Sequence, residues 1–341
     1  MINTIYRLIS PKMIDIAYEE VNIQDNKVIV RPTYLSICKA DQRYYQGTRE
    51  PKILTEKLPM ALIHEAIGEV VYDKSGKFKS GDVVTIIPNT PIEKDEIIGE
   101  NYLQSSKFRS SGFDGFLQDY IFSPHDRLVK IGGKINYQVA SFSELISVCY
   151  HAIDRFDKFY NGRSDSIGVW GDGTLSYIIA ILLKFLNPKT KIIVFGKHQD
   201  KLSYFTFADE IYLINQIPAD LKLDHAFECV GGHGAQSAID QIIDTINPEG
   251  TISLLGVTEY PILINTRMIL EKGLRLYGSS RSSKEDFENT IKLLEKFPEI
   301  INYLENLVIS VCPIRTINDI NQAFEKDNQT NFGKTILLWD K

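Results

Sequence analysis

The stretch from 166 to 201 constrains the fold most, because it reads as a strand, a glycine turn, a helix and a second strand. Ile167–Trp170 is a short apolar run of the kind that forms a buried parallel strand. Gly171-Asp172-Gly173 follows at once, and Ser176–Leu186 is apolar almost all round, as a buried helix is. A second apolar run, Lys191–Phe195, completes the unit.

Glycines between a strand and a helix suit a dinucleotide site, because they let the backbone come close to a pyrophosphate at the helix N-terminus. The fingerprint of such sites is G-x-G-x-x-G, and Ser176 takes the place of its third glycine here. An ordinary tight turn is the alternative interpretation, and the strand–helix–strand context favours the cofactor site. We expect the cofactor to contact the residues of the turn, which are Gly171, Asp172, Gly173, Thr174 and Leu175.

The residues after the second strand indicate which dinucleotide binds. NAD sites usually carry Asp or Glu there, to accept a hydrogen bond from the ribose 2′-hydroxyl. This chain has Gly196-Lys197-His198, with Lys201 one turn later and no carboxylate before Asp200. Small and cationic residues suit a 2′-phosphate, so we predict NADPH or NADP+, held by Lys197 and Lys201. The alternative is that these lysines form a solvated face.

The bulk properties exclude several classes of protein. The 341 residues suggest two domains, and 43% hydrophobic residues suffice for packed cores. A net charge of −6 without a basic block argues against nucleic acid as a partner. The sequence shows no signal peptide and no apolar run long enough to cross a membrane. Four scattered cysteines favour a reducing compartment, so we expect a cytoplasmic protein.

The two halves of the chain differ in their patterns. Residues 1–135 read as short strands rich in valine and isoleucine, separated by turns. After residue 201 strands and helices alternate, and with the first two strands they predict a six-stranded, doubly wound parallel sheet. The tail from Val308 returns to β character. We predict a nucleotide domain over 141–282, inserted into a catalytic domain made of 1–140 and 283–341.

Cys38, the pair His64-Glu65 and Glu144 are candidate metal ligands. Each of them alone fits a structural role better. A lone cysteine is usually a core residue, a lone histidine is usually hydrogen bonded, and a glutamate that opens a helix interacts favourably with the helix dipole.

A series of motifs, in order along the chain, favours the interpretation of these residues as metal ligands. The sequence resembles the zinc-dependent medium-chain dehydrogenases, including their sorbitol dehydrogenase branch, over the segments Ser36–Asp41, Ile63–Val70, Ser80–Val84, Glu144–Val148 with His151-Ala152, Phe227–Gly231 and Leu255–Val257. Ile63 replaces the glycine that precedes the family's histidine. The resemblance implies an α/β protein with a GroES-like, β-rich catalytic domain and a Rossmann domain.

The resemblance also implies the site residues. A catalytic zinc would be held by Cys38, His64 and Glu144, with Glu65 beside it as a water holder or alternate ligand. Asp41 would orient His64. On the nucleotide domain, the segments that resemble the nicotinamide pocket contain Cys229, Val230 and Gly256, and Ser279 is a further expected cofactor contact.

The chain departs from the family at two places. The stretch 89–115 matches the lobe that often binds a structural zinc through four cysteines, but it contains no cysteine. We therefore expect one catalytic zinc and no structural zinc. Ala40 stands where alcohol dehydrogenases have the Ser or Thr that passes the proton. Water, Glu65 and a tyrosine such as Tyr44 are the alternatives for that role.

Three arginines are candidates for binding a substrate phosphate. Arg43 and Arg49 follow the candidate ligand cysteine, and Arg109 stands beside serine and glycine. Solvated surface arginines are the alternative interpretation. The segments 38–49, 108–116, 170–173, 227–232 and 278–282 resemble the bacterial ribulose-5-phosphate reductases, also called ribitol-5-phosphate dehydrogenases, of teichoic-acid and capsule synthesis.

This closer resemblance implies NADPH-dependent reduction of D-ribulose 5-phosphate to D-ribitol 5-phosphate, upstream of a cytidylyltransferase that makes CDP-ribitol. A homodimer or homotetramer is expected by analogy. One alternative function is a zinc polyol dehydrogenase of the sorbitol type, acting on an unphosphorylated sugar. Another is a zinc-free, NADPH-binding structural protein, against which the presence of Cys38, His64 and Glu144 argues.

Overall fold

The computed structural model describes residues 1–23, 27–133 and 135–341, which divide into two compact units. Unit 1 consists of Met1–Ser147 and Ser282–Lys341, and unit 2 consists of Val148–Arg281. The first division falls inside helix α4 (Ser143–Phe159), which runs through it without a break. The domain limits inferred from the sequence, at 140/141 and 282/283, stay predictions.

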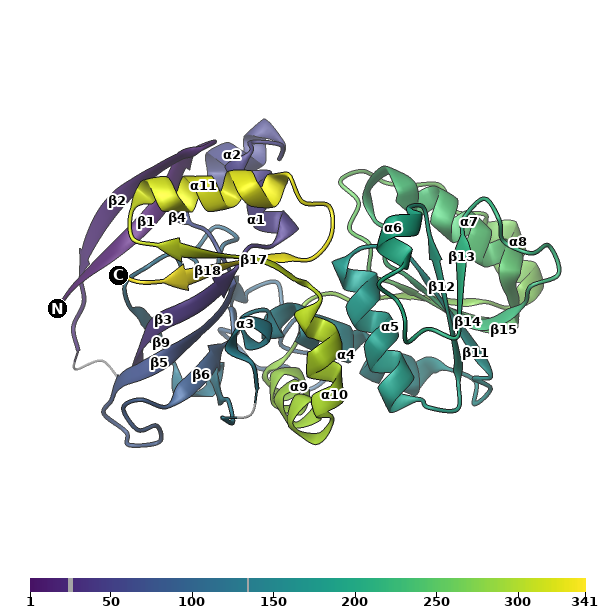
Figure 1. Ribbon diagram of the computed structural model, residues 1–341, viewed down its shortest axis with the longest axis horizontal. Coiled ribbons are helices and arrows are strands. Elements are labelled where there is room, and N and C mark those ends of the chain that lie inside the picture. Colours follow the sequence, from purple (N-terminus) through teal and green to yellow (C-terminus); the bar gives the residue numbers. More distant parts are fainter. Residues whose placement is uncertain (24–26, 134) are drawn as a thin grey trace. The chain divides into compact units, whose positions relative to one another are not determined.

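Unit 2 is built on a parallel sheet of six strands (Figure 1). The strand order is β13-β12-β11-β14-β15-β16, the 3-2-1-4-5-6 order of a dinucleotide-binding sheet, in which the carboxyl ends of the strands form the binding edge. The predicted doubly wound sheet is therefore confirmed. In chain order, its strands are β11 (Ser166–Trp170), β12 (Lys191–Gly196), β13 (Glu210–Leu213), β14 (Leu223–Glu228), β15 (Ile246–Leu254) and β16 (Arg275–Gly278).

The helices of unit 2 connect these strands. Helix α5 follows the glycine turn, and eight consecutive residues from Ser176 to Leu183 are buried, which explains why its sequence is apolar almost all round. Trp170 stacks on Phe195 with ring centroids 3.9 Å apart and joins the two strands that flank the turn. The helical segments of unit 2 after α4 are α5 (Thr174–Leu186), α6 (Gln199–Leu202), the 3-10 turn η2 (Gly232–Gly234), α7 (Ala235–Thr245) and α8 (Thr266–Lys272).

Unit 1 is β-rich, as the short valine- and isoleucine-rich runs predict. Its main sheet has the order β10-β6-β5-β3-β18-β17, with β9 paired to β3, and a second sheet has the order β2-β1-β4. The last strand of the chain, β18, pairs with β3, so the tail belongs to this sheet. The strands are β1 (Ile2–Ser10), β2 (Met13–Glu20), β3 (Val28–Ser36), β4 (Met60–Ala61), β5 (Glu65–Asp73), β6 (Val83–Ile86), β7 (Asn89–Thr90), β8 (Lys107–Phe108), β9 (Ile121–Ser123), β10 (Leu128–Lys130), β17 (Val308–Ile314) and β18 (Lys334–Trp339).

The longer helices of unit 1 begin at clear sequence signals. Ser283 caps α9 and Thr316 caps α11, and each forms a capping box with the Asp three residues later. Pro298 opens α10 in the first helical turn, where a missing N–H costs nothing. Besides α4, the helical segments are α1 (Lys39–Tyr45), α2 (Pro51–Lys57), η1 (His125–Arg127), α3 (Tyr137–Ala140), α9 (Lys284–Lys296), α10 (Pro298–Glu305) and α11 (Ile317–Asn328).

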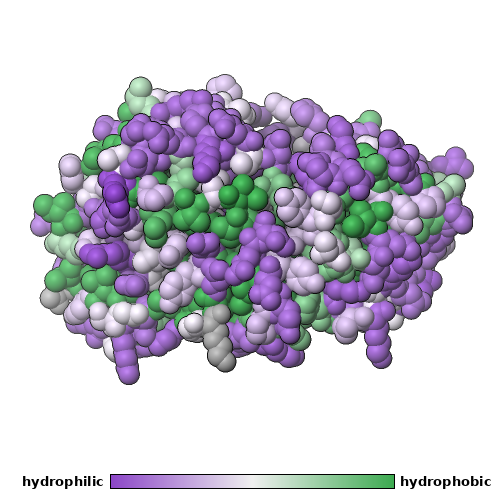
Figure 2. All heavy atoms as spheres, viewed as in Figure 1, coloured by the Kyte–Doolittle hydropathy of each residue, from purple (hydrophilic) through white to green (hydrophobic). Residues whose placement is uncertain are grey.

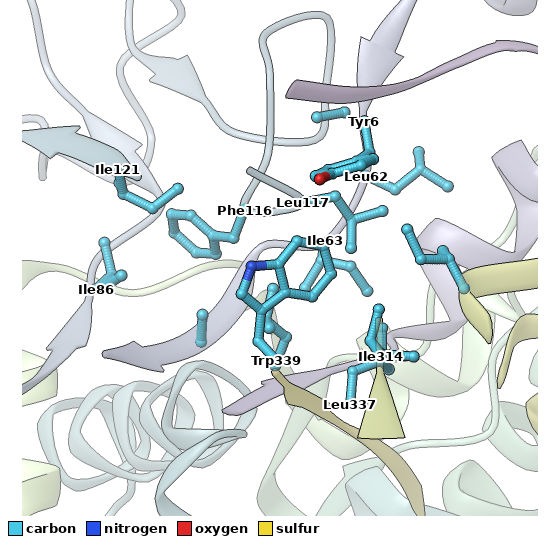
Figure 3. Packing of buried hydrophobic residues seen from close by; sticks show 14 of the residues in the cluster. Tyr6, Leu62, Ile63, Ile86, Phe116, Leu117, Ile121, Ile314, Leu337 and Trp339 are labelled. Carbon is cyan, nitrogen blue, oxygen red and sulfur yellow. The ribbon is translucent and has the colours of Figure 1, made fainter. Parts of the chain in front are cut away.

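The core of unit 1 gathers around Trp339, near the end of β18. Figure 3 shows its indole at the centre of the view, with Tyr6, Ile63 and Phe116 around it. The rings of Tyr6 and Trp339 meet edge to face, with centroids 5.5 Å apart, a favourable aromatic geometry. This core therefore joins the first strand, the segment before His64 and the last strand.

The cysteine-free lobe of unit 1 is held by an ion pair. The guanidinium of Arg127 donates to Glu100 Oε1 at 2.9 Å and Oε2 at 3.3 Å, and the backbone N–H of Lys284 donates to the same Oε1 at 2.7 Å. The Arg127 side chain is 4% exposed and that of Glu100 is 24% exposed. Glu100 thus connects the lobe to the N-terminus of α9.

The surface is mostly polar. Hydrophilic side chains predominate on the face that Figure 2 shows, with smaller hydrophobic groups between them. Within the described residues, none of the helices combines the length and the hydropathy that crossing a lipid bilayer requires.

We predict that Arg127→Met destabilises the protein by about 3 kcal/mol, because it leaves the Glu100 carboxylate partly buried without its partner. Urea unfolding, followed by circular dichroism, measures this change. Arg315→Met is the matched control, since Arg315 pairs with Asp340 but is 72% exposed, and an exposed pair contributes at most about 1 kcal/mol. Equal effects of the two substitutions would contradict a structural role for the Glu100–Arg127 pair.

Candidate active site

Three of the predicted metal ligands lie together in unit 1. Cys38 is the N-cap of α1, His64 lies between β4 and β5, and Glu65 is the first residue of β5. One ligand atom from each of the three lies within 4.8 Å of the other two. His64 is 6% exposed and Glu65 is fully buried. Main-chain pairing of β3 with β5 brings these segments together, because Ser36 lies opposite Glu65.

Asp41 connects the segments that carry these residues. Its Oδ1 accepts hydrogen bonds from the Ile63 N–H at 2.9 Å and from Ser110 Oγ at 2.6 Å. Its Oδ2 accepts from the Cys38 N–H at 3.1 Å, and His64 Nδ1 lies 3.6 Å from Oδ1. Burial alone would raise the pKa of Asp41, but His64 and the hydrogen-bond donors bring that pKa below its ordinary value.

Ile63, at the position of the family's glycine, has a backbone conformation that glycine adopts readily. Its φ of +72° lies in the left-handed region, which β-branched residues rarely adopt. Its side chain is fully buried and lies beside Trp339 (Figure 3). Burial of the isoleucine side chain offsets the strain of this turn before His64.

The sequence did not single out Lys334, which pairs with Glu65. Its Nζ lies 2.8 Å from Glu65 Oε1 and 2.7 Å from Oε2, and it also donates to the carbonyl of Ile37 at 3.1 Å. The side chains of Lys334 and Glu65 are 4% and 0% exposed. Lys334 opens β18, about 270 residues after Glu65, so only the sheet pairing brings the two side chains together.

Glu144 lies near this group but outside the set of three. It is in the first turn of α4 and is 7% exposed. Burial raises the pKa of Glu144 to about 7, while His64 and Lys334 act to lower it and Glu65 acts to raise it. Glu144 is thus close enough for these charges to act on it, and it offers a second buried carboxylate.

The three candidate phosphate-binding arginines have different surroundings. Arg43 is in α1, directly after the Cys38 segment, and is half-buried. The guanidinium of Arg49 lies over the Tyr44 ring, 5.0 Å from its centroid. Arg109 donates to the backbone carbonyls of Asp114 at 3.2 Å and Phe122 at 3.1 Å. Its neighbour Ser110 donates to Asp41 instead of forming a phosphate cradle.

In unit 2 the glycine turn has the form that a dinucleotide site needs. Gly171 has a φ of +131°, and a Cβ there would lie 3.2 Å from the Cys229 carbonyl oxygen. Gly173 is the N-cap of α5, and a Cβ there would meet only open space. Ser176, at the third glycine position, is buried and donates to the Gly173 carbonyl at 2.8 Å. The turn thus leaves room for a pyrophosphate where Thr174 and Leu175 begin the helix.

Glu228, at the end of β14, ties two neighbouring loops together. Its Oε1 accepts from the N–H groups of Val230 at 2.8 Å and Gly231 at 2.9 Å, and its Oε2 accepts from the Gly256 N–H at 3.0 Å. A Cβ at Gly256 would lie 2.5 Å from the carboxylate. Cys229, Val230 and Gly256 are predicted cofactor contacts, whereas no role was predicted for Glu228. Ser279, the remaining predicted contact, is buried just after β16.

The donor set in unit 1 fits a zinc ion. Thiolate sulfur, imidazole nitrogen and carboxylate oxygen are the zinc ligands found in proteins. Cys38, half-buried, and His64 and Glu65, both buried, offer one of each. Asp41 faces Nδ1 of His64, which leaves Nε2 for a metal, and a carboxylate behind a ligand histidine is the usual arrangement.

Comparison with known proteins agrees with both units. Residues 24–133 match the alcohol dehydrogenase GroES-like domain, and residues 191–296 match the zinc-binding dehydrogenase domain. The ribulose-5-phosphate reductase of Bacillus spizizenii is 52% identical over 340 residues, covering 100% of both chains. Ribulose-5-phosphate reductase 2 of Staphylococcus aureus is 54% identical over 342 residues, covering 99% of both.

The crystal structure of S. aureus TarJ in complex with NADPH superimposes with a TM-score of 0.90, at 48% identity and over 100% of both chains. The L-idonate 5-dehydrogenase structure from Escherichia coli shares the fold, with a TM-score of 0.87 at 21% identity over 99% of both chains. The medium-chain dehydrogenase fold expected from the sequence is thus confirmed. With matches of this identity along its entire length, the chain belongs to the zinc-binding dehydrogenases with a GroES-like domain, in the family of the bacterial ribulose-5-phosphate reductases.

Proposed function

We propose that this protein reduces D-ribulose 5-phosphate to D-ribitol 5-phosphate with NADPH. The observation that carries the proposal is the close group of Cys38, His64 and Glu65 in unit 1, in a chain that is 52% identical along its whole length to a ribulose-5-phosphate reductase. The similarity to TarJ, whose structure holds NADPH, supports the choice of cofactor.

In this proposal, residues of unit 1 bind the zinc and residues of unit 2 bind NADPH. When bound, zinc supplies a Lewis acid for the C2 carbonyl and NADPH supplies the hydride. Cys38 and His64 would hold the zinc, with Glu144 or Glu65 as the third protein ligand, and Asp41 keeps the His64 ring in place. In unit 2 the turn 171–175 would hold the pyrophosphate, and Lys197 and Lys201 the 2′-phosphate. Cys229, Val230, Gly256 and Ser279 would border the nicotinamide.

Two carboxylates compete for the third ligand position. Glu65 is bound by Lys334 in this structure, which occupies its oxygens and neutralises its charge. Within the part of the chain that the structure describes, Glu144 forms no ion pair like that of Glu65 with Lys334. Burial is the main cause of its raised pKa, and a bound cation would offset that cost. We therefore propose Glu144 as the ligand and Glu65 as the alternate, with one zinc per chain and none in the cysteine-free lobe.

Arginines of unit 1 would bind the substrate phosphate. Arg43 and Arg49 rank first, because they lie 5 and 11 residues after Cys38 in the sequence, in α1 and just beyond it. A guanidinium forms charge-assisted, paired hydrogen bonds with a phosphate. A phosphate pocket favours the phosphorylated ketose over the free sugar, which a sorbitol-type dehydrogenase would use.

The product fits a place before a cytidylyltransferase, in a pathway to CDP-ribitol for teichoic acid or capsule. We propose that the reaction takes place in the cytoplasm, since all four cysteines are free, as in reducing compartments. A homodimer or homotetramer is proposed by analogy with relatives of this fold.

The first test follows NADPH absorbance with D-ribulose 5-phosphate and with D-ribulose at equal concentration. We expect oxidation with the phosphate only, lost after treatment with a zinc chelator and regained when zinc is added back. Equal rates with both sugars would support the dehydrogenase activity but contradict the proposed phosphate-binding site. Activity unaffected by thorough chelation, in protein shown to be metal-free, would contradict the zinc assignment.

Arg43→Ala and Arg49→Ala should each raise the KM for D-ribulose 5-phosphate about tenfold or more, because each loses a charge-assisted hydrogen bond of about 1.5–3 kcal/mol. Steady-state kinetics at saturating NADPH measure the change. Arg31→Ala is the control, since Arg31 is exposed and bonds to the Tyr120 hydroxyl. An unchanged KM in both variants and in Arg109→Ala would remove these arginines from the site.

Lys334→Met should destabilise the metal-free protein by about 3–5 kcal/mol, because it leaves Glu65 as a buried charge with no partner. Urea unfolding of chelator-treated protein gives the free energy. The double variant Lys334→Met/Glu65→Gln should recover much of the loss, since it removes the buried charge as well. If Lys334→Met were as stable as the parent protein, the Lys334–Glu65 pair would not contribute to stability.

A further inference from the structure

Asp172, the middle residue of the glycine turn, binds the end of the neighbouring strand. Its Oδ2 accepts hydrogen bonds from the backbone N–H of Lys197 at 2.7 Å and of His198 at 2.8 Å. The His198 ring nitrogen Nδ1 lies 2.9 Å from the same oxygen. Lys201 Nζ lies 4.0 Å from Oδ1. One carboxylate thus organises the whole cationic segment after β12.

Gly196, the last residue of β12, shows that this arrangement replaces the one found in NAD sites. Those sites carry a carboxylate at the end of the second strand. A Cβ at Gly196 would lie 2.7 Å from Asp172 Cβ and 2.7 Å from Leu202 Cδ2, so a side chain there and Asp172 exclude each other. In this chain the carboxylate at the end of β12 is therefore that of Asp172, which belongs to the glycine turn.

The charge of Asp172 is satisfied inside the protein. Its side chain is 13% exposed. Burial acts to raise the pKa of Asp172, but the N–H groups of His198 and Lys197 hold that pKa below its ordinary value. All three hydrogen bonds fall on Oδ2, so this oxygen has little capacity left for a ribose hydroxyl. The amino groups of Lys197 and Lys201 bring two positive charges to the same segment, against the single negative charge of Asp172.

We propose that Asp172 is a positioning residue that sets the preference for a 2′-phosphorylated dinucleotide. It does so by fixing the 197–198 backbone and the His198 ring, so that His198 joins Lys197 and Lys201 as a partner of the 2′-phosphate. The proposal rests on the NADPH dependence in the proposed function and adds His198 to the predicted contacts.

The test measures dissociation constants for NADPH and NADH by quenching of intrinsic fluorescence, without any sugar. We expect Asp172→Ala to weaken NADPH binding about tenfold, which corresponds to about 1.4 kcal/mol. NADH binding should change about threefold at most, because NADH has no 2′-phosphate. Asp200→Asn is the control, because it removes a carboxylate from the same segment that accepts none of these bonds, and it should alter neither constant.

Two further variants keep the proposal testable if Asp172→Ala folds poorly. His198→Ala should also weaken NADPH binding more than NADH binding. The exchange Asp172→Gly/Gly196→Asp, which moves the carboxylate to the strand end, should shift the ratio of the two constants toward NADH. Thermal unfolding verifies that each variant is folded.

An equal loss for both cofactors, or unchanged NADPH binding in both single variants, would overturn the positioning role. Because these measurements use no ketose, they are independent of the substrate. A parent protein that binds NADPH no better than NADH would instead show that the proposed cofactor is wrong.

Discussion

The Asp41 carboxylate is the contact on which the catalytic unit depends. It joins the start of α1, the turn before β5 and the lobe, through bonds to Cys38, Ile63 and Ser110. These segments are up to about 70 residues apart in the sequence, and the carboxylate adds to the pairing of β3 with β5, which brings the Cys38 and His64 segments together. Because two of the donors are main-chain N–H groups, the carboxylate fixes backbone positions, and with them the directions of the cysteine and histidine side chains.

Two carboxylates in unit 2 also accept hydrogen bonds from several backbone N–H groups. Glu228 accepts three backbone N–H groups from two loops, and Asp172 accepts two from the end of β12. An isolated buried carboxylate would be costly, but each bond from a donor to a charged group contributes about 1.5–3 kcal/mol. A carboxylate with several backbone donors therefore stabilises one loop conformation strongly. All three carboxylates lie next to predicted metal or cofactor contacts, where a shift of 1 Å matters for catalysis.

Local patterns made the six-stranded sheet and the glycine turn predictable, because apolar period and glycine position are properties of neighbouring residues. The candidate ligands came from motifs matched to a family, since no spacing rule brings Cys38 to His64. The partners of those residues were not predictable. Lys334 meets Glu65 only through the pairing of β18 in the sheet, and Arg127 meets Glu100 only in the folded lobe. Lysine and arginine are usually exposed, so sequence alone assigns both to the surface.

Ile63 shows why a departure from a motif need not change the site. The family motif has glycine before the histidine, and glycine adopts a left-handed backbone conformation without strain. Ile63 adopts that conformation in this chain, at a cost of about 1–2 kcal/mol for an L-residue. Full burial of an isoleucine side chain contributes about 1.5–3 kcal/mol, and Ile63 is fully buried against the Trp339 core. The core of the unit thus supplies the energy that holds the turn, and the His64 position depends on packing as well as on the Asp41 bonds.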